Sequence, residues 1–60
     1  MLYAIDLSDA NQARKLIEYE EHDRGYPMSR DQKRDLLEAW SDWPLGYIGM
    51  IVEHMERTLR

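Results

Sequence analysis

The last third of the chain constrains the fold more than any other segment, because its pattern predicts one helix with an unusually wide apolar surface. At about 100° per residue, one apolar stripe consists of Leu45, Ile48, Val52, Met55 and Leu59. A second stripe, which Ile51 joins, consists of Trp43, Tyr47, Met50 and His54. Together they cover roughly half of the circumference or more, whereas an ordinary surface helix has an apolar stripe ~100° wide. Such a helix needs several neighbours, which come either all from this chain or partly from a partner.

The chain offers little else from which to build a core. Its 60 residues form one domain, 1–60, near the lower size limit for an independent core. There is no cysteine, so neither a disulfide nor a thiolate zinc site can supplement packing. The sequence therefore predicts a single small domain of marginal stability, and we expect it to act as a homo-oligomer or as a subunit of a complex.

The net charge of −4 favours some classes of partner over others. It opposes non-specific attraction to nucleic acid and anionic lipid, and it favours a basic protein partner. Residues 1–7 lack the basic leader and long apolar stretch of a signal peptide, and no run approaches the ~20 apolar residues that span a bilayer. We therefore expect a cytoplasmic protein without a membrane segment.

A first helix is predicted over residues 8–23. Asp6 or Ser8 can cap its start, Gly25 supplies a left-handed residue after its end, and Pro27 prevents the helix from resuming. Its inward face would contain Ala10, Ala13, Leu16 and Ile17. Residues 1–7 remain open between a short strand, an extended arm and an early helical turn. A strand there would need a second chain to pair with, because no other run alternates with period two.

Two further helices are predicted over residues 30–40 and 44–59. Ser29 and Gln32 have the spacing of a capping box at the start of the second helix, whose inward face would contain Leu36, Leu37 and Trp40. Pro44 disfavours helix at the residue before it and is well tolerated as a first helical residue. The fold class predicted is therefore all-α: three short helices with a tight corner between the second and the third, and a short extended N-terminal arm as one option.

Acidic side chains gather at the end of the first helix, where Glu18, Glu20 and Glu21 stand beside His22 and Asp23. Glu18 and His22 are four residues apart and could share a cation, but two adjacent ligands without a second cluster favour a solvated helix end over a metal site. Either Arg24 and Arg30 neutralise this end across the loop, or the acidic patch attracts a basic partner. The sequence leaves both alternatives open.

No residue pattern predicts catalysis. General acid–base chemistry needs two titratable groups in a dry pocket, which a core this small does not offer. Ser8, Ser29 and Ser41 all fall where a helix begins, so capping explains their hydroxyls. Gly46 and Gly49 lie inside a helix, whereas a phosphate-binding glycine loop precedes one. The sequence therefore predicts no catalytic residue, no cofactor and no enzyme.

Gly46 and Gly49 have a different structural meaning. They lie on one side of the third helix with Glu53 and remove side-chain bulk where another backbone could approach. The first helix of the same chain is the favoured neighbour at that place, and a second chain is the alternative.

The second stripe of the third helix is the best candidate for function. Aromatic residues and methionine are enriched at the centres of protein interfaces. Trp40 is expected in the core, and Met50 and His54 are expected at a surface contact. For Trp43 and Tyr47 both alternatives stay open. In the core alternative, Trp43 fills the corner between the helices and Tyr47 closes over Met28 or Tyr26.

We therefore hypothesise a non-catalytic protein–protein interaction module, a small acidic regulator, inhibitor or adaptor. It would bury Trp43, Tyr47, Met50 and His54 against a partner or against itself, while Glu18, Glu20 and Glu21 steer a basic partner electrostatically. Small acidic proteins of this kind are common among phage and mobile-element products, which is an analogy of class only.

A minimal helix-turn-helix transcription regulator over residues 30–58 is the alternative. Its DNA-reading helix would begin Pro44-Leu-Gly-Tyr, which is poor in side chains that reach base edges. The basic residues of the chain also alternate with acidic ones instead of forming a stripe. Binding that weakens steeply with salt would separate this alternative from the protein-binding hypothesis.

Overall fold

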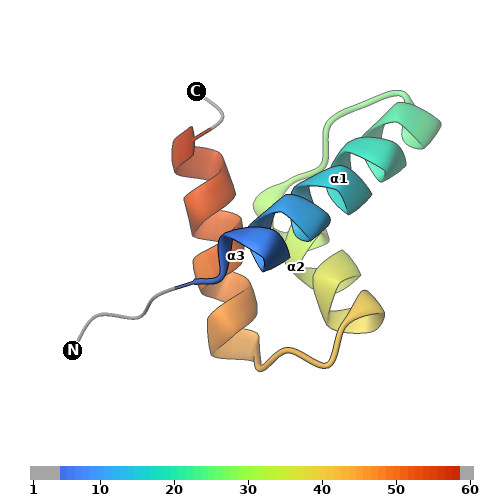
Figure 1. The fold of residues 1–60 in the computed structure, drawn as a ribbon. Coiled ribbons are helices and arrows are strands. Elements are labelled where there is room, and N and C mark those ends of the chain that lie inside the picture. The colour runs from blue at the N-terminus through green and yellow to red at the C-terminus, as the bar shows by residue number, and fades with distance from the viewer. Residues whose placement is uncertain (1–4, 59–60) are drawn as a thin grey trace.

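A computed structural model describes residues 5–58, which form three helices and contain no strand (Figure 1). Helix α1 spans Leu7–Arg24, α2 spans Arg30–Trp40, and α3 spans Leu45–Thr58. The prediction of an all-α, three-helix domain is confirmed, with helix limits within one residue of those expected wherever the structure describes them. Most of the segment for which an N-terminal arm was considered, and Leu59 of the first apolar stripe, lie outside the described residues.

Local hydrogen bonds fix the limits of α1. The Asp6 carboxylate accepts the Ser8 backbone N–H at 2.8 Å, so Asp6 rather than Ser8 is the N-cap. At the other end Gly25 adopts φ 82°, and its N–H donates to the Glu21 carbonyl at 2.8 Å. Glycine reaches this left-handed conformation without the clash that a Cβ would cause. Both ends of α1 therefore follow from residues at the ends themselves.

The capping box at the start of α2 is present. The Gln32 backbone N–H donates to the Ser29 hydroxyl at 3.2 Å, and the Ser29 backbone N–H donates to the Gln32 side-chain oxygen at 2.9 Å. Two backbone donors that the helix itself cannot satisfy are thus paired.

The corner between α2 and α3 corrects two details of the sequence prediction. Ser41 lies at the end of α2, where its hydroxyl donates to the Leu37 carbonyl at 2.7 Å and accepts the Trp43 N–H at 3.2 Å. Its hydroxyl therefore stabilises the corner instead of starting a helix. α3 begins at Leu45, one residue later than predicted, and the Pro44 carbonyl accepts the first helical hydrogen bond, from Ile48 at 3.0 Å.

The core lies where the three helices meet, and α3 contacts both of the others (Figure 1). The buried side chains are Ala10, Ala13, Ile17, Met28, Leu37, Ile48, Ile51, Val52 and Met55. More of them come from α3 than from any other element, so α3 is the central helix that its wide apolar arc predicted.

Four predicted core residues are not buried, and one of them is Leu16, which is only partly buried against the core. Trp40 is 46% exposed and Leu45 is 55% exposed. Trp40 is the last residue of α2 and Leu45 is the first residue of α3, so both lie at the corner, beyond the region where the helices pack against one another. Leu36 is only partly buried. Ile51, which the sequence grouped with the contact stripe, is fully buried instead.

Candidate protein-interaction surface

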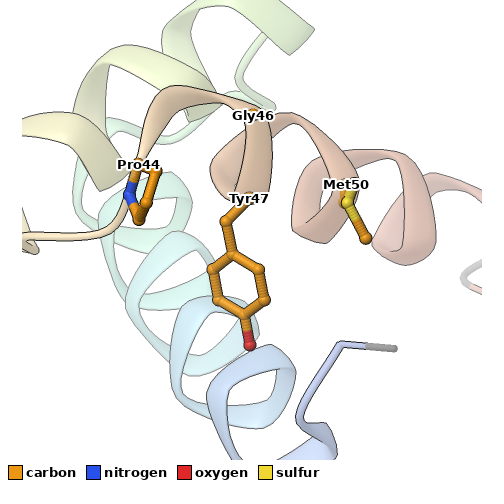
Figure 2. Close-up of a pocket in the computed structure, with 4 residues that line it drawn as sticks. All are labelled: Pro44, Gly46, Tyr47 and Met50. Atoms are coloured by element: carbon orange, nitrogen blue, oxygen red, sulfur yellow. The ribbon is translucent and has the colours of Figure 1, made fainter. Parts of the chain in front are cut away.

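A shallow apolar groove lies along the corner and the first half of α3 (Figure 2). Its volume is about 560 Å³, and it is lined by Pro44, Gly46, Tyr47 and Met50. Two of these residues, Tyr47 and Met50, belong to the predicted contact stripe. Pro44 and Gly46 were not predicted as contact residues, since the sequence explained them by helix initiation and by backbone packing.

The groove opens on the side of α3 that faces away from the core. With the core side defined by Ile48, Ile51, Val52 and Met55, helical periodicity puts four residues on the opposite side. They are Gly46, Met50, Glu53 and Arg57, which we call the outer stripe of α3. Met50 is therefore an apolar side chain that points outward, and Figure 2 shows it on the surface of the helix.

Tyr47 forms the wall of the groove that faces α1. Its hydroxyl donates to the Asp9 carboxylate at 2.6 Å and accepts the Asp6 backbone N–H at 3.1 Å. The hydrogen bond to Asp9 is the main reason why the pKa of Tyr47 is raised above its ordinary value, while the N–H of Asp6 acts in the opposite direction and desolvation adds to the rise. In the core alternative Tyr47 would close over Met28 or Tyr26, whereas its hydroxyl is bound to the start of α1.

The aromatic residues of the corner pack edge to face. The ring centroids of Trp40 and Trp43 are 5.5 Å apart at an interplanar angle of 81°, and those of Trp43 and Tyr47 are 5.5 Å apart at 85°. This geometry is favourable for aromatic pairs. Trp43 is also partly buried against the core, so it connects the ring of Tyr47 to the core.

Within residues 5–58, the two glycines of α3 do not serve a close approach of another element. A Cβ placed on Gly46 or on Gly49 would have no neighbouring atom within 4 Å. The expectation that the first helix packs against them is therefore wrong. Gly46 lies on the side of α3 that faces away from α1 and α2, whereas Gly49 lies on the flank of α3 and lines a hollow with Arg30 and Arg34 of α2.

A second hollow continues the groove toward the end of α3. It is lined by Met50, Glu53, His54 and Arg57, with Ile5 from the segment before α1. Of the four predicted contact residues, Tyr47, Met50 and His54 thus line two hollows that share Met50, and Trp43 contacts the ring of Tyr47.

The predicted steering residues lie elsewhere. Glu18 is exposed, Glu20 forms an ion pair with Arg24 at 3.7 Å, and the Glu21 carboxylate accepts the Met28 N–H at 2.8 Å. Glu20 follows Asp9 by eleven residues, which is about 16 Å along a helix. That distance exceeds the screening length of roughly 8 Å at physiological salt. The structure therefore does not bring the acidic end of α1 together with the groove.

A long-range ion cluster between α2 and α3 was not foreseen from the sequence. Arg30 donates to Glu56 from Nε at 2.9 Å and from Nη2 at 2.7 Å, and Lys33 Nζ lies 3.8 Å from the same carboxylate. The hydrogen bonds from Arg30, followed by the charges of Arg30 and Lys33, lower the pKa of Glu56 despite its partial desolvation. Arg30 is therefore held at α3 and does not neutralise the acidic end of α1, whereas Arg24 does pair there.

The described residues form a small three-helix domain with an apolar groove on its central helix. Within residues 5–58, no group of three or more His, Asp or Glu side chains is placed to hold a metal ion. None of the described helices is both long and apolar enough to cross a bilayer. Comparison of the chain with protein-family models, curated proteins and solved structures gives no match.

Proposed function

We propose that this chain is a non-catalytic protein-interaction module, a small acidic regulator, inhibitor or adaptor that acts in the cytoplasm. One observation carries the proposal: the groove of Pro44, Gly46, Tyr47 and Met50 is apolar, open and turned away from the core. A groove of this kind accepts an apolar ridge of another protein, and aromatic and methionine side chains are the types that dominate such contacts.

The polar chemistry of the groove supports binding rather than catalysis. Its one side-chain hydroxyl, on Tyr47, already donates to Asp9 and accepts from Asp6. A partner therefore meets ring carbons, the Met50 thioether and the open face of Gly46. Burying such surface stabilises a complex in proportion to the apolar area removed from water.

The helix-turn-helix alternative has no supporting feature on the outer stripe. The stripe offers one cation, Arg57, which pairs with Glu53 at 3.6 Å. The remaining residues, Gly46 and Met50, have no group that reads a base edge.

Site-specific photo-crosslinking tests the proposal. A benzoyl-phenylalanine placed at Met50 in the full chain, expressed in its own cells, is expected to yield a discrete protein adduct on irradiation. The matched control carries the same group at Tyr19, which is 68% exposed on α1. An adduct at position 50 that is absent at position 19 supports a contact at the groove. A folded position-50 variant that forms no adduct, or identical adducts at both positions, contradicts it.

A further inference from the structure

We infer that Asp9 of α1 is a positioning residue for the groove: through the Tyr47 hydroxyl it holds in place the ring that forms one wall of the groove. The inference rests on the proposed function, because it takes the groove as a contact surface, and it goes further by naming what controls the shape of that surface. The groove has this wall only while the first turn of α1 is folded.

The Tyr47 side chain extends from α3 toward the start of α1 (Figure 2). Its hydroxyl donates to the Asp9 carboxylate at 2.6 Å and accepts the Asp6 backbone N–H at 3.1 Å. A change of χ1 rotamer turns the ring by about 120° and moves the hydroxyl by several ångströms, so only one rotamer can form these hydrogen bonds. Asp9 and Asp6 therefore select one orientation of the ring.

The first turn of α1 is a firm support for Asp9. The Asp6 carboxylate caps the helix at the Ser8 N–H, and the Asp6 carbonyl accepts the Ala10 N–H at 3.0 Å. Ala10 is itself buried in the core. Asp9 lies in the same turn, where the positive end of the helix dipole favours a carboxylate. The position of Asp9 is therefore fixed by this turn and not by the groove.

The packing of Trp43 supports the same ring but is the weaker constraint. Its ring meets that of Tyr47 edge to face, with the centroids 5.5 Å apart. A hydrogen bond to a charged carboxylate is stronger than an aromatic contact of this kind, and 2.6 Å is the short distance typical of such a bond. Without Asp9 we therefore expect the ring to populate other staggered rotamers as well.

Nuclear magnetic resonance on the full chain tests the inference through the χ1 rotamer of residue 47. Three-bond couplings across χ1 in the parent chain should correspond to one rotamer. Asp9→Ala should lower the population of that rotamer to about a half or a third, because two or three staggered rotamers then share the ring. The matched control, Asp31→Ala, removes a carboxylate from the first turn of α2 and should keep the parent couplings.

The pKa of Tyr47 gives a second readout, which a purely structural role of Asp9 would not change. The hydrogen bond to Asp9 is the main cause of its rise, and the charges of Asp9 and Asp6 add to it. A titration of the Tyr47 ring carbons should therefore give a lower pKa in Asp9→Ala than in the parent, and the parent value in Asp31→Ala. Circular dichroism verifies that each variant is folded.

Tyr47→Phe replaces Asp9→Ala in the rotamer measurement if Asp9→Ala does not fold. It keeps the ring and removes only the hydroxyl, so the couplings of residue 47 should again be averaged over two or three rotamers.

Crosslinking tests the consequence for binding. With benzoyl-phenylalanine at Met50, the additional substitution Asp9→Ala should lower the adduct yield by about two- to three-fold, since only molecules with the wall in place are competent to bind. The control Asp31→Ala should leave the yield unchanged.

Three results would overturn the inference: a single, unchanged rotamer at residue 47 in folded Asp9→Ala or Tyr47→Phe, an unchanged pKa of Tyr47 in folded Asp9→Ala, or an adduct yield that does not depend on Asp9. None of these contradicts the proposed function, because an adduct at position 50 would still show a contact at the groove. Absence of any adduct would instead remove the proposed function, while the couplings and the pKa would still decide whether Asp9 holds the wall.

Discussion

Replacing Gly49 with alanine should stabilise the monomer, which is the opposite of what a packed glycine would show. Gly49 is the fifth residue of the 14-residue α3, so it lies in the helix interior. Its φ is not positive, and an added Cβ has no neighbour within 4 Å. Alanine therefore brings no clash, and it gains the difference in helix propensity, about 1 kcal/mol. Gly46 lies in the first turn, where we expect a smaller gain.

For a domain of this size, 1 kcal/mol corresponds to a shift in melting temperature of roughly 4–8 °C. Thermal unfolding followed by circular dichroism, with urea titration at fixed temperature, measures both the shift and the free energy of unfolding. If the free energy of unfolding falls with urea concentration at the same slope in the variant and the parent, the added stability does not come from altered compactness of the unfolded chain.

Gly25→Ala is the matched control, because it makes the same chemical change at φ 82°. Alanine is strained in that left-handed conformation, so Gly25→Ala should lower the melting temperature while Gly49→Ala raises it. If Gly49→Ala destabilises the monomer, some atom lies against that position and the reasoning about open space is refuted. If both variants shift in the same direction, the propensity argument fails.

The remaining predictions concern the contacts that hold the helices together. Tyr47→Phe removes both hydrogen bonds to the start of α1 and should lower the melting temperature by a few degrees. Because the pKa of Tyr47 is raised in the folded protein, the contribution of its hydroxyl to the free energy of unfolding is complete below pH ~10 and is lost as the pH rises through the folded pKa. Urea titrations at alkaline pH should show this loss in the parent and not in Tyr47→Phe. The pKa of Glu56 is lowered by Arg30, so its contribution to the free energy of unfolding is present above its ordinary pKa of 4.5 and disappears as the pH falls through the folded pKa. Glu56→Gln should lower the free energy of unfolding at neutral pH and reduce its further decrease at acid pH. If the decrease at acid pH is the same in Glu56→Gln as in the parent, other groups cause it. Leu37→Ala should cost about 2–5 kcal/mol, because Leu37 is fully buried where the helices meet, and equilibrium urea unfolding that finds less than 1 kcal/mol would show that it is not at the centre of the core.

The helix limits were predictable because their determinants are local. The capping box of Ser29 and Gln32, the N-cap at Asp6 and the left-handed Gly25 all involve groups within a few residues of one another. The partners of such hydrogen bonds are neighbours in the sequence, so they can be identified without knowing how the helices pack. The fold class followed from them, together with the 3.6-residue periodicity of the apolar positions.

The candidate site was predictable only in part. Helical spacing identified Met50 and Tyr47 as neighbours on α3, and the structure places both at the groove. It could not show that the Tyr47 hydroxyl would find Asp9, because the two are 38 residues apart and nothing in their own neighbourhoods specifies the pairing. The contact of Arg30 with Glu56 was missed for the same reason.

The sequence by itself determined where each helix begins and ends and that α3 is the most apolar of them. Only the tertiary structure decided which apolar residues of α3 are covered. Periodicity gives the angle of a side chain about its own helix axis, whereas burial depends on where the neighbouring helices cross that axis. Ile51 is therefore buried although it was grouped with the second stripe, and Leu45 is exposed although it was placed in the stripe that holds the core. The same crossing geometry leaves Met50 facing outward beside an open Gly46.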